Sequence, residues 1–338
     1  MVSTELLIRA SQILVFPGFL FIIFYALFAE WVDRKFFARL QNRIGPLHTG
    51  WKGILQPLAD LIKLLAKGDI TPEAADSIVF ATVPLILFAI PSTIMFMVPI
   101  MGTEAYISFE GDLIVILFLF TILVLSVFMA GWSSLNRFGI IGGMRTALQM
   151  LSYEIPMGIA AVGPAILAKS ISLSGIVAWQ GRSIILFLEN PTIFSLAMGV
   201  MKAFVLALGF GIFTTCMLAE LEKVPFDIPE AETEIVGGWK VEYSGKKLAL
   251  IRLGEDIKLV AASALMTSLF LGGPLGPWPI PPFLWFLLKT TLCIMIISNL
   301  RALFARYRID QLISWMWKNL VPLSLLYIVA IEMLAMVM

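Results

Sequence analysis

Histidine and cysteine are nearly absent from this sequence of 338 residues, which contains one histidine and two cysteines. Cys216 and Cys293 both lie in apolar runs, and an iron–sulfur cluster or a structural zinc site needs about four protein ligands. His48 is the single histidine, which excludes a haem held between paired histidines. We therefore expect this chain to bind no metal and no redox cofactor, and electron transfer to take place in partner subunits.

Charged residues are also scarce. Only 14% of the residues are charged, 59% are hydrophobic, and the net charge is +1; the mean hydropathy is +0.94. Soluble proteins are about half apolar and about a quarter charged, so this composition is typical of a protein that crosses a membrane several times. A net charge near zero gives no basic footprint for nucleic acid, and the sequence contains no Walker-type phosphate loop.

Long apolar windows predict the membrane-spanning segments. A transmembrane helix needs about 20 apolar residues, and about eight windows qualify: 12–32, 78–100, 113–132, 152–172, 192–218, 256–273, 281–304 and 316–337. Barrel strands would alternate apolar and polar residues, which these windows do not. No small-x-small cleavage site follows the first window, so we expect it to be retained. The fold is predicted to be all-α and polytopic, with residues 1–338 forming a single integral membrane domain.

Lysine and arginine gather in four connectors, at residues 33–77, 133–151, 219–255 and 305–315, whereas the opposite connectors and the N-terminus hold Arg9 and Arg182. Basic connectors stay on the cytoplasmic side of a membrane. We therefore expect these four connectors to be cytoplasmic and both termini to lie outside.

The segment 219–245 is a polar island between two apolar windows. It holds seven acidic residues, opposed only by Lys223 and Lys240. The acidic residues are Glu220, Glu222, Asp227, Glu230, Glu232, Glu234 and Glu242. Carboxylates crowded beside a membrane repel one another and lose hydration, so some should stay protonated near neutral pH. The segment is predicted to be a cytoplasmic coupling loop that handles protons or binds a partner; the alternative is a solvated acidic loop.

Residues 53–67 are predicted to form an amphipathic interfacial helix. Ile54, Leu58, Leu61, Ile62 and Leu65 fall on one helical face. The segment is too short to span a bilayer, so we expect it to lie along the membrane surface or against a partner. For Asp60 and Lys63, three residues apart in the same segment, the simpler interpretation is a surface ion pair.

Ionisable residues inside or beside the apolar windows are candidates for function. A Gly142–Gly143 break is expected to precede a helix that carries Arg145 and ends the connector, with Glu154 at the mouth of the fourth window. Lys202 lies within the fifth window. The alternatives are an interfacial carboxylate with satisfied hydrogen bonds for Glu154 and a snorkelling side chain for Lys202.

Five sequence blocks, in order, carry a family resemblance. They are DRKFFARLQNRIGP (33–46), GILQPLADLIKLL (53–65), IGGMRTALQMLSYEIPMG (141–158), PFDIPEAETEIVGGWKVEYSG (225–245) and RYRIDQL (306–312). Together they span most of the chain. The chain resembles the NuoH family, called NADH dehydrogenase subunit 1 in mitochondria. It is similar also to the homologous subunits of archaeal membrane-bound hydrogenases, sulfane sulfur reductases and formate hydrogenlyases.

This resemblance implies an eight-helix subunit in the plasma membrane of a prokaryotic cell. It lies beneath a peripheral arm, which has a hydrogenase-like large subunit and a small iron–sulfur subunit, and beside antiporter-like membrane subunits. Ion-coupling positions are then Glu220, Asp227, Glu230, Glu232, Glu234, Glu242, Glu154, Asp60 and Arg145, to which we add Lys202. Positions that dock the arm or line a quinone-like chamber are Asp33, Arg34, Lys35, Arg39, Arg43, Lys63, Phe226, Arg308 and Asp310.

Several positions depart from the pattern of quinone-using members of the family. They are Asp33, Leu47, the pair Glu222–Lys223, and Ile309. Because they cluster around the chamber, they favour a hydrogenase-type or sulfane-reductase-type complex without bound quinone. The alternative is the quinone-binding subunit of an NADH, deazaflavin or ferredoxin:quinone oxidoreductase. Two more interpretations stay open: an autonomous secondary ion transporter that uses Glu154 and Lys202, and a passive membrane anchor.

Overall fold

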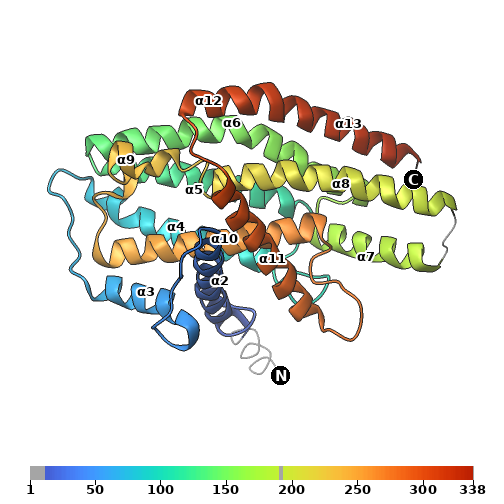
Figure 1. Cartoon of the computed structure of the whole chain (residues 1–338), viewed down its shortest axis with the longest axis horizontal. Coiled ribbons are helices and arrows are strands. Elements are labelled where there is room, and N and C mark those ends of the chain that lie inside the picture. The colour runs from blue at the N-terminus through green and yellow to red at the C-terminus, as the bar shows by residue number, and fades with distance from the viewer. Residues whose placement is uncertain (1–11, 190–192, 338) are drawn as a thin grey trace.

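A computed structural model describes residues 12–189 and 193–337, and every regular element in those residues is helical. Most of the long helices run side by side as a bundle, while α2 and α11 run across it; α9 and α3 lie near one end and α7 near the other (Figure 1). The prediction of an all-α polytopic protein is thus confirmed.

The helices follow one another along the whole described chain. The longer ones are α2 (Phe19–Leu40), α3 (Gln56–Ala66), α4 (Ser77–Met97), α5 (Asp112–Ser133), α6 (Arg137–Ala168), α7 (Leu173–Glu189), α8 (Ile193–Glu220), α10 (Gly245–Phe270), α11 (Pro282–Leu303) and α13 (Val321–Val337). The short ones are η1 (Trp51–Gly53), η2 (Ile228–Glu230), α9 (Glu232–Ile235), η3 (Gly238–Lys240), α12 (Ile309–Trp315) and the π-helical turn η4 (Met316–Leu320).

Seven helices of the described chain are long and apolar enough to cross a membrane. They are Gln12–Leu40, Ser77–Met97, Asp112–Ser133, Arg137–Ala168, Met198–Glu220, Pro282–Leu303 and Ile309–Val337. The remaining predicted window, 256–273, begins within α10 and ends three residues beyond it, and the first half of α10 carries several charged residues. From Leu259 to Leu269 every residue of α10 is buried, and the helix contacts α2, α3, α4, α8 and α11. α10 is therefore the central helix of the bundle (Figure 1).

Helix α6 corrects one expectation from the sequence. No break occurs at Gly142–Gly143, because α6 runs unbroken for 32 residues, about 48 Å at 1.5 Å per residue. Most of the expected connector 133–151 is therefore helix. The two glycines serve close packing instead: a Cβ on Gly142 would lie 2.7 Å from the backbone nitrogen of Trp239, and one on Gly143 would lie 3.0 Å from the carbonyl oxygen of Phe128.

Helix α7 was not predicted, because its sequence contains no apolar window of sufficient length. Its N-terminus is held by the buried carboxylate of Asp112 at the start of α5, which accepts a hydrogen bond from the backbone N–H of Leu173 at 2.7 Å. A carboxylate at this place satisfies a backbone donor of the first helical turn and complements the helix dipole.

The four basic connectors lie on the same side of the bundle, as the sequence predicted. An ion pair joins the connector 219–255 to each of the other three: Lys223–Asp33 at 3.7 Å, Lys247–Asp69 at 3.3 Å, Arg145–Glu234 at 2.7 Å, and the pair Arg306–Asp227. The orientation with this side cytoplasmic and both termini outside stays a prediction from the distribution of lysine and arginine.

The predicted amphipathic helix at 53–67 is present as α3, over Gln56–Ala66. Pro57 is buried, and α3 contacts α2 and α10. Ile62 and Leu65 remain exposed. One face of α3 thus packs on the bundle, while apolar residues remain available to lipid or to a partner.

We predict that Gly142→Ala destabilises the protein. The added Cβ would lie 2.7 Å from the backbone nitrogen of Trp239 and 2.9 Å from the carbonyl oxygen of Pro229, both in the segment 219–245, which we call the acidic loop. Overpacking of this kind costs about 1–3 kcal/mol. Gly158→Ala on the same helix is the matched control: it meets nothing within 4 Å and should be neutral or stabilising by up to ~1 kcal/mol. Thermal unfolding in detergent measures both, and equal effects would contradict the close contact between α6 and the loop.

Candidate functional site

The last residue of α8, Glu220, is the innermost carboxylate of the acidic segment. It is 2% exposed, its Oε1 lies 2.7 Å from Lys258 Nζ on α10, and its Oε2 accepts a hydrogen bond from the Tyr153 hydroxyl on α6 at 2.7 Å. Lys258 also donates to the backbone carbonyl of Glu220 at 2.6 Å. Removing one partner of a buried ion pair costs about 3–5 kcal/mol. This group therefore fixes three helices at the point where the acidic loop begins.

A second group surrounds the ammonium of Lys240. Lys240 Nζ forms ion pairs with both Glu230 and Glu255. Glu222 lies beside them and accepts a hydrogen bond at 3.4 Å from the indole N–H of Trp239. Three carboxylates thus share a single lysine at the entrance to the bundle. We call Glu222, Glu230, Lys240 and Glu255 the loop cluster.

The loop cluster holds more acid groups than it can keep ionised. Burial and the negative charge of Glu230 raise the pKa of Glu222 to about 8. Burial acts in the same direction on Glu230, but the neighbouring Lys240 ammonium lowers the pKa of Glu230 below its ordinary value. Burial opposes the charged form of Lys240, and the surrounding carboxylates nevertheless raise its pKa. At neutral pH the cluster therefore holds a proton on Glu222, and a change in nearby charge can release it.

Asp33 forms a third group, between α2, α11 and the acidic loop. It is 2% exposed and accepts a hydrogen bond from Ser298. Its Oδ2 lies 3.1 Å from Arg301 Nη1 and 3.7 Å from Lys223 Nζ. Lys223 directly follows Glu222 of the loop cluster, so the backbone connects the Asp33 group to it.

A cavity of about 290 Å³ opens between α6, the acidic loop and the start of α12. It brings together four of the predicted residues: Arg145, Glu234, Arg308 and Asp310. Arg145 and Glu234 form an ion pair across it, 2.7 Å apart. Asp227 accepts a hydrogen bond at 2.7 Å from Nε of Arg306, which lines the cavity.

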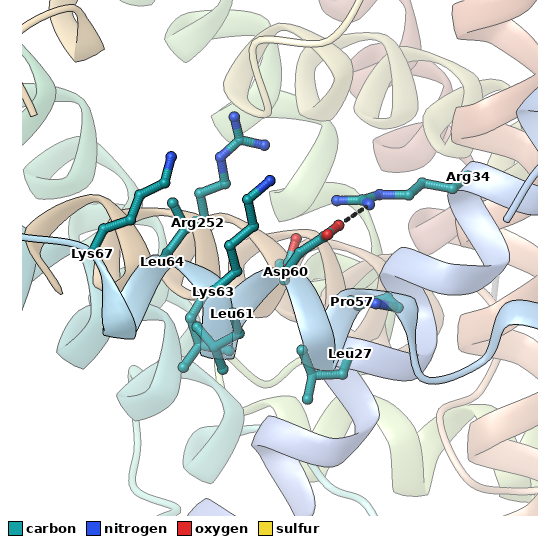
Figure 2. Close-up of a pocket in the computed structure, with 11 residues that line it drawn as sticks. Leu27, Arg34, Pro57, Asp60, Leu61, Lys63, Leu64, Lys67 and Arg252 are labelled. Carbon is teal, nitrogen blue, oxygen red and sulfur yellow. Dashed lines mark hydrogen bonds and ion pairs between the residues drawn. The ribbon is translucent and has the colours of Figure 1, made fainter. Parts of the chain in front are cut away.

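Arg34 and Lys63 line a cavity of about 180 Å³ with Asp60 (Figure 2). The Arg34 guanidinium donates to Asp60 at 2.7 Å and also pairs with Glu30. Burial opposes ionisation of Asp60, but the hydrogen bonds from Arg34 and Gln56 and the positive charge nearby lower its pKa. Asp60 is thus a stably ionised partner of Arg34.

The remaining predicted residues of the chamber group lie apart from these cavities. Lys35 Nζ donates to the Pro46 carbonyl at 2.7 Å. Arg39 and Arg43 are exposed, and buried Phe226 stacks on Tyr307 with the ring centroids 6.1 Å apart.

The four remaining predicted ion-coupling residues lie outside the three charged groups and the two cavities. Glu232 is exposed, and Glu242 accepts a hydrogen bond from Asn136, which caps α6. Glu154 accepts one from Thr121 on α5 at 2.7 Å. The Lys202 ammonium lies 3.9 Å from the ring centroid of Trp179 on α7. α7 lies near the end of the bundle opposite α9 of the acidic loop (Figure 1).

The residues that sequence reasoning missed come mainly from α10. Glu255 and Lys258 belong to the run GEDIK at the edge of the predicted window 256–273. Charges at the mouth of a span were a usable signal.

Within residues 12–189 and 193–337, no group of three histidine, cysteine, aspartate or glutamate side chains is arranged to hold a metal ion. The chemistry that these charged side chains support is proton transfer and charge redistribution.

We predict that Glu222→Gln removes a pH dependence of stability between about pH 4.5 and pH 8. Because the pKa of Glu222 is raised to about 8 from the ordinary 4.5, the folded state binds more protons than the unfolded state in this window. The free energy of unfolding should therefore fall as pH rises, by at most ~1.4 kcal/mol per pH unit. Thermal unfolding against pH measures the effect. Glu232→Gln, at an exposed position of the same loop, should keep the wild-type slope; an unchanged slope in Glu222→Gln would contradict the raised pKa.

Known proteins similar to this chain include H subunits of NADH-quinone oxidoreductases from several bacteria. The family profile described as NADH dehydrogenase matches residues 12–332. The H subunit of Dehalococcoides mccartyi is 39% identical over 318 residues, covering 93% of this chain and 84% of the relative. The second H subunit of Geobacter metallireducens is 36% identical over 341 residues, with 95% and 94% covered. That of Thermomicrobium roseum is 38% identical, with 89% of each chain covered. The chain therefore belongs to the NADH dehydrogenase (NuoH) family, whose members are membrane subunits of complex I-like oxidoreductases.

Proposed function

We propose that this chain is the coupling subunit of a complex I-like, ion-translocating respiratory oxidoreductase. It docks the peripheral iron–sulfur arm and couples the redox reaction of that arm to translocation of H⁺ or Na⁺. The observation that carries the proposal is the loop cluster, where three carboxylates share Lys240 at the end of a bundle that buries Glu220. The names of the relatives, as subunits of an oxidoreductase, support the same conclusion.

Coupling would operate through the electric field of the arm. One elementary charge about 10 Å away contributes ~1.7 kcal/mol at an effective dielectric constant of ~20, which corresponds to roughly one pKa unit. Because the pKa of Glu222 is already about 8, a charge change that lowers it by roughly one unit brings it to neutral pH, where the carboxyl group is about half ionised. An added electron in the arm would favour protonation, and its departure would favour release.

The route from arm to membrane would begin at the Asp33 group. A charge change beside Asp33 acts on Lys223, 3.7 Å away, and then on the adjacent Glu222 and the loop cluster. From there the helices α8 and α10 lead to the Glu220–Lys258 ion pair. The exposed Arg39 and Arg43 would bind the arm from the same side. The iron–sulfur clusters themselves belong to the partner subunits in this proposal.

For the redox partner we propose a hydrogenase-type or sulfane-reductase-type arm. Two of the positions that depart from the quinone-type pattern, Asp33 and Lys223, form an ion pair with each other. Both keep the sign of the usual charge and change the side chain that carries it, so these two departures alter one ion pair beside the chamber. The second candidate is a quinone reductase, which the names of the relatives favour.

We predict that Glu230→Gln, introduced into the intact complex, lowers ion translocation per electron at least several-fold while the complex still assembles. The change removes one of the two carboxylates paired with Lys240. It also removes the negative charge of Glu230, which, after burial, contributes most to the raised pKa of Glu222. Ion uptake and electron transfer measured together in proteoliposomes give the ratio. The control is Glu110→Gln, a change at an exposed residue that is distant in sequence from the acidic loop. Unchanged pumping with an intact complex would indicate a passive anchor.

We also predict that the native complex transfers electrons without quinone and resists inhibitors that occupy quinone sites. The purified complex is assayed with hydrogen, sulfur compounds and quinone analogues, each offered separately as electron donor or acceptor. These assays distinguish a hydrogenase-type or sulfane-reductase-type arm from a quinone reductase. The subunits that copurify, a nickel-binding large subunit or an NADH module, provide the second readout. Turnover that requires quinone would overturn the assignment of the arm and leave the coupling role intact.

A further inference from the structure

The ammonium group of Lys289 on α11 is held by three backbone carbonyl groups of the turn that joins α10 to α11. It donates to the carbonyl oxygens of Leu271 at 2.6 Å, Gly273 at 3.1 Å and Leu275 at 2.5 Å. Each of the three N–H donors of an ammonium group can thus reach a carbonyl oxygen. In the part of the chain that the structure describes, no carboxylate forms an ion pair with Lys289. Its charge is therefore balanced by carbonyl dipoles and by the negative end of the α10 helix dipole.

Two glycines give the turn the shape that leaves these carbonyl groups available. Gly272 and Gly273 have φ angles of 77° and 53°, in the left-handed region where a side chain would be strained. The amides of Leu271 and Gly273 both donate to the carbonyl oxygen of Thr267 near the end of α10, at 3.0 and 2.9 Å. The amides thus bind the helix end, and the carbonyl oxygens remain for Lys289.

The rest of the turn is fixed by α11. The indole N–H of Trp285 donates to the carbonyl oxygen of Pro277 at 3.1 Å. The Trp285 ring also lies so close to Gly276 that a Cβ there would come within 2.4 Å of it. Prolines at positions 274, 277, 279, 281 and 282 restrict the backbone further. We therefore expect the ring of carbonyl oxygens to keep its dimensions when the cation inside it is changed.

Two more oxygen atoms lie beside the glycine pair. Ser268 is fully buried, and its hydroxyl has no hydrogen-bond partner among the described residues; its Oγ lies 3.8 Å from the place of a Cβ on Gly273. Gln180 of α7 donates to the carbonyl oxygen of Leu269 at 2.6 Å. The Oε1 of Gln180 lies 3.4 Å from the place of a Cβ on Gly272. An unpartnered buried hydroxyl calls for an explanation, and both oxygens are of the kind that a bound cation uses.

The chemistry of these oxygen atoms indicates which cation they suit. Divalent cations such as Ca²⁺ and Mg²⁺ are bound with the help of carboxylates, whereas every oxygen of this turn that contacts Lys289 is neutral. Rings of backbone carbonyl oxygens replace the hydration shell of K⁺ in channel filters. An ammonium group and K⁺ are similar in size, so a ring that fits one fits the other.

We propose that the turn between α10 and α11 is a site for a monovalent cation and that the Lys289 ammonium is its resident cation. The tethered charge keeps K⁺ and Na⁺ away from the end of α10 that lies opposite the acidic loop, as fixed positive charges exclude mobile cations from other membrane proteins. A lysine that only capped the helix end would make the same hydrogen bonds, but its removal would leave no site for a free ion. This inference is independent of the proposed coupling function.

The test is hydrogen exchange of residues 268–276 in the intact complex, measured by mass spectrometry for Lys289→Ala in choline chloride and in KCl. Without its cation the turn should open more often, so we expect exchange at least roughly tenfold faster than in wild type in choline chloride. KCl at about 100 mM should restore most of the protection, because K⁺ fits the vacated ring and choline is too large for it. Wild type should exchange equally in both salts.

Two control variants separate ion binding from general effects. Lys289→Met fills the same space without a charge, so its turn should exchange faster than in wild type and gain no protection from KCl. Lys318→Ala, a change at an exposed lysine, should behave as wild type in both salts.

Several results would overturn the proposal. Equally fast exchange of Lys289→Ala in both salts would show that Lys289 only caps α10. Wild-type protection of Lys289→Ala in choline chloride would show that the turn needs no cation. Equal recovery of the alanine and methionine variants in KCl would indicate a general salt effect, and recovery with Mg²⁺ but not with K⁺ would contradict the monovalent class. If Lys289→Ala does not assemble in choline chloride, recovery of the complex from membranes solubilised in KCl would support the site, and equal loss in both salts would contradict it.

Discussion

The structure depends on the partial burial of more carboxylates than there are lysines to neutralise them. Glu222, Glu230 and Glu255 surround Lys240, and Lys258 alone pairs with the buried Glu220. Desolvation penalises each ionised carboxylate, while the lysine ammonium groups favour ionisation of the nearest ones. The outcome is an unequal sharing in which Glu230 is ionised and Glu222 is protonated near neutral pH. Such a balance responds to small external changes in charge, which a fully neutralised cluster would not do.

The surrounding fold keeps this balance in place. α10 passes through the middle of the bundle and supplies both Glu255 and Lys258, so the two charged groups are held by one rigid element. α6 extends beyond the thickness of a bilayer and reaches the acidic loop, where Gly142 lets the backbone around Trp239 come close. The tryptophan next to Lys240 is thereby buried, and the loop is fixed relative to the helices. A loop that moved freely would hydrate its carboxylates and return their pKa values to the ordinary range.

Composition and periodicity predicted much of this architecture. The apolar windows, the amphipathic helix α3 and the common side of the four basic connectors all follow from short-range patterns, which the structure reproduces. The expected break at Gly142 and Gly143 is wrong because a sequence does not show the neighbouring backbone that requires a missing side chain. α7 was missed because it is held by the tertiary contact of Leu173 with Asp112 rather than by a long apolar run. Glu255 and Lys258 were missed because their partners, Lys240 and Glu220, lie on different elements.

The most direct measurement is the infrared difference spectrum between the oxidised and reduced forms of the intact complex, recorded for wild type and for Glu222→Gln. If redox changes in the arm alter the charge balance of the loop cluster, wild type should show a carboxyl band that changes with redox state and shifts in deuterium oxide, and Glu222→Gln should lack it. A wild-type spectrum without any change in carboxyl protonation, in a complex that still translocates ions, would contradict the account.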